Sequence, residues 1–186
     1  MTAQAREKLI YKGETTWMAA QPLNDYLENV KDIEFVADCS ACWRGYFGKW
    51  EIKDNSLYLI GLDATIKGHK QVGLDYLFPG QDCVFADWFS GKIRIPQGEM
   101  LDYVHMGYAS LYERDLILVF KKGLLIKEFM VDNEKKIQKR KTERERLKLM
   151  QFFDKAKEKK NDKTFNIVTT TLIVLLLIGL VLVFVF

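Results

Sequence analysis

The last twenty residues of the chain carry no charged side chain. Residues 167–186 read IVTTTLIVLLLIGLVLVFVF, and sixteen of the twenty are Ile, Val, Leu or Phe. Twenty helical residues span about 30 Å, the thickness of the hydrocarbon core of a bilayer. At about 0.3–0.6 kcal/mol for each large apolar residue, insertion into a bilayer is favoured by roughly 5–10 kcal/mol. A buried core helix or an apolar strand seldom runs this long without a charge. The sequence therefore predicts a transmembrane helix within residues 164–186, with the lipid bilayer as its partner.

Basic residues before this segment predict its orientation. By the positive-inside rule, they favour a single-pass protein whose preceding domain is cytoplasmic. The first twenty residues lack the 7–15-residue apolar run of a secretory signal peptide, so we expect a tail-anchored protein in a reducing compartment. We expect five lysines to lie at the membrane surface against anionic lipid headgroups, where each contributes about 1 kcal/mol: Lys155, Lys157, Lys159, Lys160 and Lys163.

Charge divides the chain into three parts. Residues 1–133 hold 15 basic and 19 acidic side chains, a net charge of −4, whereas residues 134–163 hold 13 and 6, a net charge of +7. Residues 164–186 hold none, so the total of +3 averages three different regions. The sequence predicts a cytoplasmic domain over residues 1–132, a basic helical stalk over 133–163 and the anchor over 164–186.

The predicted stalk has the composition of a solvated helix. Residues 133–163 contain no Gly or Pro, and either Asp132 or Asn133 is suited to cap the helix. Residues 133–163 are expected to serve as a spacer or to lie along lipid headgroups. Nucleic-acid binding is not favoured, because the basic residues lack interleaved glycines and aromatic residues. Apolar Leu147, Met150 and Phe153 favour at most a weak homo-oligomer, since they cover fewer than three heptads.

The domain is predicted to be mainly β. A hairpin is expected where the turn-forming residues 54–56 separate Trp50–Lys53 from Leu57–Leu62. A second is expected where Lys122-Gly123 separates Asp115–Lys121 from Leu124–Met130. No βα repeat is present, so a doubly wound parallel sheet is not expected.

Further elements follow from periodicity. Lys92–Ile95 and Tyr103–Tyr112 have the aromatic and β-branched content of strands. The spacing of apolar residues predicts a helix over Pro22–Lys31 and a helical turn near Leu74–Phe78. The predicted fold is an antiparallel small barrel or sandwich with one or two peripheral helices.

Aromatic residues gather in three blocks. These are WRGYFGKW at 43–50, ADWFSGKIRIPQG at 86–98 and YVHMGYASLY at 103–112. One interpretation is a β core that uses aromatic bulk, with Trp43, Trp50 and Trp88 inside. The other is a ligand-binding face for a protein or small molecule, with Trp88 as its floor. Its polar contacts would be Arg44, Asp87, Ser90, His105, Tyr108 and Tyr112.

These blocks resemble a group of bacterial proteins of unassigned function. The resemblance covers roughly residues 9–131 and excludes the stalk and the anchor. It implies a bacterial origin, and hence the inner membrane, but no activity, cofactor or catalytic residue.

Cys39-Ser40-Ala41-Cys42 is a CxxC motif. Such a pair is a redox dithiol or half of a metal site in a reducing compartment. The redox interpretation lacks the βαβ context, and a zinc site would need Cys83 and a histidine at a spacing that follows no known finger. We therefore expect small, buried, inert thiols, with no metal and no cofactor.

The sequence carries no enzyme motif. His105 is expected in a strand, sharing a face with Tyr103 and Gly107, and Ser90 and Ser110 lie in no G-x-S-x-G elbow. The leading hypothesis is a tail-anchored protein that presents a cytoplasmic β-rich binding or scaffold module. Two alternatives remain. One is a small hydrolase or thiol enzyme that uses His105 or Cys39 and Cys42; the other is a membrane effector with a ligand-sensing β domain.

Overall fold

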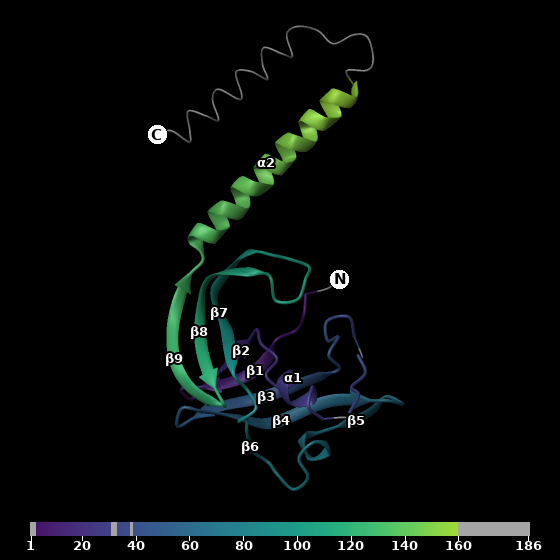
Figure 1. Cartoon of the computed structure of the whole chain (residues 1–186), viewed down its shortest axis with the longest axis vertical. Helices are drawn as coiled ribbons and strands as arrows, with labels where there is room; N and C mark the ends of the chain where they lie inside the picture. The colour runs from purple at the N-terminus through teal and green to yellow at the C-terminus, as the bar shows by residue number, and fades with distance from the viewer. Residues whose placement is uncertain (1–2, 31–32, 38, 160–186) are drawn as a thin grey trace. The chain divides into compact units, whose positions relative to one another are not determined.

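A computed structural model describes residues 3–30, 33–37 and 39–159. The chain divides into two units, Met1–Ile137 and Gln138–Phe186. The first is a β domain and the second contains most of a long helix (Figure 1). The predicted anchor at 164–186 lies outside the described residues, as do Lys160 and Lys163.

Nine described strands form one sheet. Seven follow the order β2-β1-β3-β4-β9-β8-β7, while β5 and β6 both pair with β4. The strands are β1 (Glu7–Tyr11), β2 (Glu14–Met18), β3 (Tyr46–Lys53), β4 (Ser56–Ile66), β5 (Lys70–Val72), β6 (Val84–Phe85), β7 (Gly91–Asp102), β8 (Leu111–Lys121) and β9 (Leu124–Asp132). The mainly-β prediction is confirmed.

Two-residue turns close the predicted hairpins. Asp54 and Asn55 both have positive φ, as do Lys122 and Gly123, which is the geometry that matches the twist of paired strands. Both predicted hairpins are therefore confirmed, as β3–β4 and β8–β9. A third, β1–β2, turns through Lys12 and Gly13 in the same way.

The expectation of a wholly antiparallel sheet is wrong at one pair. β1 runs parallel to β3, with Leu9 opposite Trp50, so the sheet is mixed. A parallel neighbour requires a long crossover, and residues 19–45 supply one. This connection contains α1 (Asn24–Leu27), a single turn much shorter than the helix predicted over Pro22–Lys31.

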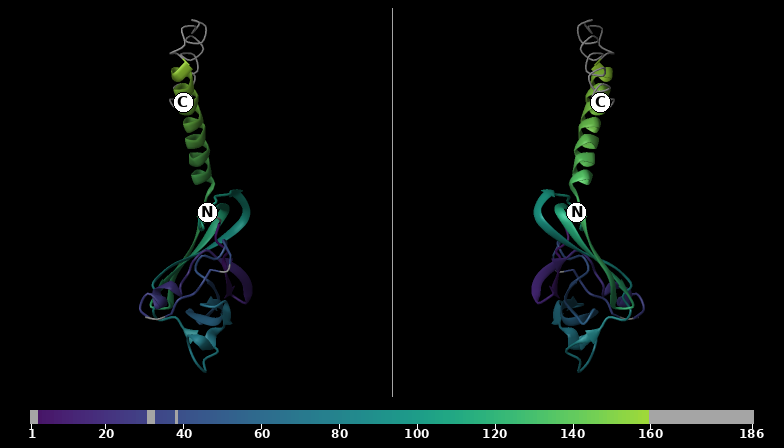
Figure 2. Two further views of the ribbon diagram at one scale, coloured as in Figure 1. Left: turned by 90° about the vertical axis from the view of Figure 1, so that its right-hand side faces the viewer. Right: turned by 90° about the vertical axis from the view of Figure 1, so that its left-hand side faces the viewer.

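The sheet curls until its two ends meet. The backbone N–H of Ala19, just after β2, donates to the carbonyl of Arg94 in β7 at 2.7 Å. β4 and β9 pair only at Ser56 and Leu124 and then diverge. As a result β7, β8 and β9 run steeply across the direction of β3 and β4 (Figures 1 and 2). The architecture is a strongly curved, mixed sheet whose end strands β2 and β7 approach each other.

Apolar residues from both halves of the sheet fill the interior. Leu9, Trp50, Leu57, Leu59 and Ile93 are fully buried there, with Ile95 and Leu118 beside them. The predicted helical turn is present as the 3-10 turn η1 (Leu74–Tyr76), and its neighbours Leu77 and Phe78 also enter the core.

One predicted strand is wrong. Residues 103–110 form an irregular loop, and β8 begins only at Leu111. Gly107 has positive φ, and the hydroxyl of Ser110 binds the backbone of Val104. Beyond these local contacts, the backbone of the loop pairs through an isolated bridge from Gly107 to Ala3 and not through a continuous ladder.

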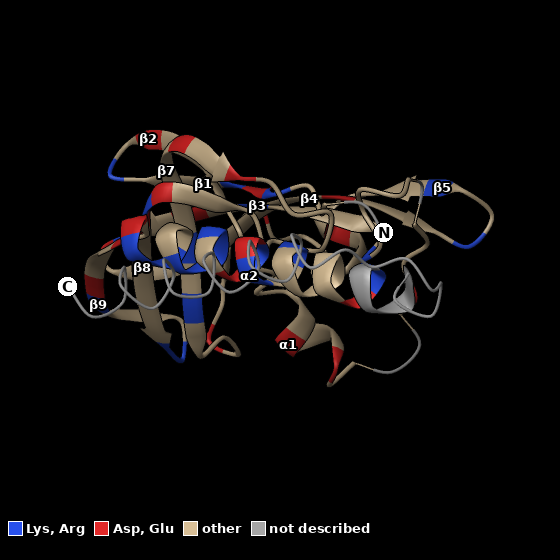
Figure 3. Ribbon diagram, turned by 90° about the horizontal axis from the view of Figure 1, so that it is seen from above, with Lys and Arg blue, Asp and Glu red and all other residues tan. Residues whose placement is uncertain are grey.

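The helix α2 (Glu134–Lys159) begins in the β domain, which includes its first turn up to Ile137. The rest of α2 belongs to the second unit. The Asp132 carboxylate accepts the N–H of Glu134 at 2.8 Å, and the Asn133 carbonyl accepts that of Ile137 at 3.0 Å. The predicted cap is thus confirmed. Basic and acidic side chains are interspersed along the helix (Figure 3). No helix among the described residues is long and apolar enough to cross a membrane.

Candidate functional site

The most unusual position in the β domain is a carboxylate in the core. Glu7 begins β1 on the same face as Leu9, and both are fully buried. Arg44, which precedes β3, places its Nε atom 3.0 Å from Oε1 of Glu7, and only 5% of the arginine side chain is exposed. The indole N–H of Trp50 donates to Oε2 of Glu7 at 2.6 Å. A buried carboxylate thus has a cation on one oxygen and a donor on the other.

The backbone of β3 packs closely against Glu7 and Trp50. Gly48 in β3 lies against both side chains, and a Cβ added there would overlap Nε1 of Trp50 and come within 2.6 Å of Oε2 of Glu7. Only a residue without a side chain allows this close approach.

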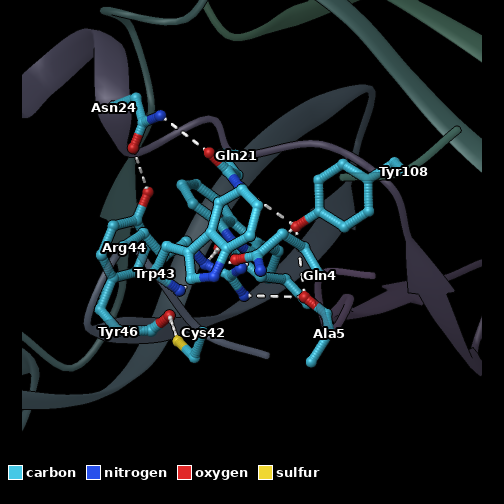
Figure 4. A network of polar contacts seen from close by, with 11 residues as sticks. Gln4, Ala5, Gln21, Asn24, Cys42, Trp43, Arg44, Tyr46 and Tyr108 are labelled. Carbon is cyan, nitrogen blue, oxygen red and sulfur yellow. Dashed lines mark hydrogen bonds and ion pairs between the residues drawn. The ribbon is translucent and has the colours of Figure 1, made fainter. Parts of the chain in front are cut away.

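The guanidinium of Arg44 also binds the loop between β7 and β8. Its Nη1 donates to the Tyr108 hydroxyl at 3.2 Å, and its Nη2 donates to the Ala5 carbonyl at 3.1 Å (Figure 4). The rings of Tyr46 and Phe47 lie beneath the same group, 5.4 and 4.9 Å from it. Arg44 therefore joins β1, β3 and the 103–110 loop.

Hydrogen bonds extend this network to α1. The Tyr108 hydroxyl donates to the Ala5 carbonyl and accepts from the Gln21 amide, at 3.2 and 3.3 Å. Asn24 links Gln21 to the Tyr46 hydroxyl, which donates to Oδ1 of Asn24 at 2.6 Å (Figure 4).

Burial dominates the protonation of these groups. It raises the pKa of Glu7 to about 7, against the opposing effects of the Arg44 charge and the Trp50 hydrogen bond. Burial also raises the pKa of Tyr46 and of Tyr108. Because Glu7 is fully buried, it is not placed to act as a base on a substrate, and its proton instead affects stability.

A second buried cluster lies at the start of the stalk. The Asn133 amide donates to Oδ2 of Asp115 at 2.8 Å and to the Tyr112 carbonyl at 3.0 Å. Arg94 lies 3.6 Å from the same Asp115 oxygen and also binds the carbonyls of Tyr108 and Ser110. Asp115 and Asn133 are 2% and 0% exposed, so the first turn of α2 is tied into the core.

The loop residue Tyr108 connects the two clusters. Its hydroxyl contacts Arg44, and its carbonyl accepts a hydrogen bond from Arg94. A chain of polar contacts therefore runs from Glu7 through the loop to Asn133.

Of the predicted ligand-binding residues, the structure brings Arg44 and Tyr108 into contact. Trp88 lies elsewhere, partly buried, where it donates to the Pro22 carbonyl at 3.0 Å and stacks on Phe78 at 5.7 Å. Asp87 and Ser90 flank it on the surface, and the Ser90 hydroxyl accepts the N–H of Lys122 at 2.9 Å. Asp87 and Trp88 lie in a turn, and Ser90 follows it beside the β8–β9 hairpin.

The other predicted residues lie on the 103–110 loop and β8. His105 is in the loop, not in the strand expected for it, and its ring packs edge-on against Tyr103 at 4.6 Å. Tyr112 contacts Arg6, whose guanidinium hydrogen-bonds its hydroxyl and lies 4.5 Å from the centre of its ring.

The cysteines differ from the expected set of buried thiols. Cys42 is buried, but Cys39 and Cys83 are exposed, and all three are free thiols. Within the described ranges, no three His, Cys, Asp or Glu side chains gather in a way that could hold a metal ion.

A surface hollow of about 480 Å³ lies between the end of β1, the β3–β4 turn and the first half of β9. Glu128 crosses one side of it, with its carboxylate 3.0 Å from Nζ of Lys12 and bonded to the Tyr11 hydroxyl. None of the predicted site residues lines it. Its lining consists of Tyr11, Lys12, Ile52, Asp54, Asn55, Leu125, Ile126, Lys127 and Glu128.

In comparisons with known proteins, no family, curated protein or solved structure matches the chain.

Proposed function

We propose that the chain is a membrane-tethered binding module, in which residues 164–186 hold the β domain at a bilayer through the α2 stalk. The observation that carries the proposal is the buried contact between Asn133 and Asp115. It ties the start of the stalk into the core of the domain, and the stalk leads directly to the charge-free segment. A flexible linker would need no buried residue at this point.

The charge pattern supports a particular orientation. The lysines that precede the apolar segment favour the cytoplasmic side, and their attraction to anionic headgroups adds to the insertion free energy. If the chain is bacterial, as its resemblance implies, the membrane is the inner membrane. The polar contacts within the Arg44 network support its role as a framework of the domain, so we assign binding to the surface of the domain and not to this network.

Membrane extraction tests the tether. After treatment with alkaline carbonate, the full chain is expected in the membrane pellet, and a chain ending at residue 163 in the supernatant. A matched control replaces Leu176 and Leu177 by Arg, at a cost of roughly 2.5–3.5 kcal/mol each, which offsets much of the insertion free energy. Full-length protein that is released as readily as the shortened chain would refute the tether.

A competition experiment tests the binding function separately. Immobilised residues 1–137 are expected to retain a partner from a cell extract, and an excess of the free fragment should release it. The fragment must include Asn133, which the boundary predicted after residue 132 would remove. If nothing is retained that the free fragment displaces, the chain is a tether without the proposed binding function.

A further inference from the structure

The two cysteines of the CxxC motif lie at the ends of one turn. The N–H of Cys42 donates to the carbonyl of Cys39 at 3.1 Å, which closes a four-residue turn around Ser40 and Ala41. The Cα atoms at the ends of such a turn lie within about 7 Å of each other. A disulfide requires Cα atoms roughly 4.4–6.8 Å apart, so the backbone already has a geometry compatible with a bond between these residues.

The two thiols differ in exposure. Cys39 is exposed to solvent, whereas Cys42 is only 3% exposed and its thiol donates to the Tyr46 carbonyl at 3.2 Å. Both residues line one cavity of about 160 Å³, together with Gly45, Phe47, Asp63, Thr65 and Gln71. A reagent in solvent therefore meets Cys39 first, and Cys42 lies behind it across a shared space.

The burial of Cys42 also affects the protonation of its thiol. Burial raises the pKa of the Cys42 thiol, with the Arg44 charge opposing the change. Cys42 thus remains a protonated thiol in the resting domain, which disfavours it as the first nucleophile because the thiolate is the reactive form.

We propose that Cys39 and Cys42 form a thiol–disulfide exchange site that accepts small-molecule disulfides of the glutathione class. The Cys39 thiolate attacks one sulfur of the disulfide, the S–S bond breaks, and one small thiol leaves with the proton that Cys39 gave up. The Cys42 thiol then loses its proton to solvent and attacks the Cys39 sulfur, and the second small thiol leaves with a proton. In total, two protein thiols are oxidised to a disulfide, and one small-molecule disulfide is reduced to two thiols.

Closure of this disulfide has a structural consequence within the domain. The Cys42 sulfur no longer carries a proton to donate to the Tyr46 carbonyl. The segment concerned is also held by Gln4, which bonds the Ser40 carbonyl and the Trp43 N–H at 3.3 and 2.9 Å, and it leads into Arg44. The exchange site therefore adjoins the Glu7–Arg44 pair. It does not depend on the membrane tether.

The experiment uses the purified full chain in a mild non-ionic detergent, incubated with mixtures of oxidised and reduced glutathione. Exchange is stopped with acid, free thiols are alkylated, and the products are identified by intact mass and peptide mapping. The expected product is a Cys39–Cys42 disulfide, seen as the loss of two hydrogens with no glutathione attached. Cys83→Ser is the matched control, because it removes an exposed cysteine outside the motif and should leave this product unchanged.

The Cys42→Ala variant distinguishes exchange between the two cysteines from simple modification of the exposed Cys39. Without the second thiol, glutathione should remain on Cys39, with adduct on the order of tenfold more abundant than in the wild type, since a tethered thiol has an effective concentration in at least the millimolar range. The proposal is overturned if wild-type Cys39 and Cys83 accumulate glutathione to the same extent with no internal disulfide. The wild-type measurement alone decides this, even if Cys42→Ala does not fold.

Discussion

Nε of Arg44 lies 3.0 Å from Oε1 of Glu7, and the two side chains are 5% and 0% exposed. Removing two charges from water costs several kcal/mol for each ion, and their mutual attraction only partly offsets this cost. The pair is buried where β1, the start of β3 and the 103–110 loop meet. We therefore expect the pair to specify which segments lie together more than to stabilise the fold.

The raised pKa of Glu7 predicts an unusual pH dependence. Its pKa is about 7 in the folded domain against an ordinary 4.5, so the folded state binds more protons between these values. Stability should consequently fall as the pH rises from about 4.5 to 7, by roughly 3 kcal/mol from this group. Urea unfolding of residues 1–137 across this range measures the slope.

Substitution assigns the slope to one residue. Glu7→Gln should flatten the pH dependence, and it should also lower stability at pH 8 by about 3–5 kcal/mol, because Arg44 is left buried without its partner. The exposed Glu14→Gln is the control and should keep the wild-type slope. A slope that persists in Glu7→Gln would show that another group titrates.

The contact between Asn133 and Asp115 predicts a specific effect at the start of α2. Asn133→Ala should cost about 1–3 kcal/mol, because a buried carboxylate oxygen loses its amide donor. Asn133→Asp should cost more, since it places a second carboxylate beside Asp115. Amide hydrogen exchange at residues 134–137 should accelerate in both variants. Unchanged exchange there would mean that the cap alone, through Asp132, holds this turn.

Local sequence signals predicted the hairpins, because each hairpin is specified by the two residues at its turn. Asn55 and Gly123 are residue types that tolerate positive φ, and both residues of each turn adopt it here. The parallel β1–β3 pair could not be predicted in this way. It joins segments separated by residues 19–45, and its register depends on Leu9 and Trp50 sharing one core.

The Glu7–Arg44 pair could not be predicted from the aromatic blocks for a related reason. Aromatic density identified Arg44 and Tyr108, but their buried partner Glu7 lies in a separate segment, EKLIY. A period-two pattern places Glu7 on the face of Leu9, and this was the one signal that could have indicated a buried carboxylate. The aromatic content of residues 103–110 is typical of strands and predicts one there, whereas side-chain contacts to the backbone hold this loop in an irregular conformation.

Gly48 predicts a steric effect on the same pair. In Gly48→Ala the added methyl group would overlap the Trp50 indole and crowd the Glu7 carboxylate, at a cost of about 1–3 kcal/mol. Gly73→Ala is the matched control, because the nearest atom to its added Cβ is the Leu62 carbonyl oxygen at 3.6 Å. Thermal unfolding of the two variants should differ clearly. Equal melting temperatures would show that the backbone of β3 shifts to accommodate the methyl group.

The three tryptophans of the aromatic blocks should rank in the order of their burial, contrary to the interpretation in which all three lie in the core. Trp50 is fully buried and donates to Glu7, so Trp50→Ala should cost about 3–5 kcal/mol. Trp43 is 44% exposed, and Trp43→Ala should change stability by no more than about 0.5 kcal/mol. Trp88→Ala should lie between them, because it loses the stack on Phe78 and the bond to Pro22. Denaturant midpoints measure the order. If Trp88→Ala melts like the wild type but loses a captured partner, Trp88 is a ligand contact and its packing contributes little to the fold.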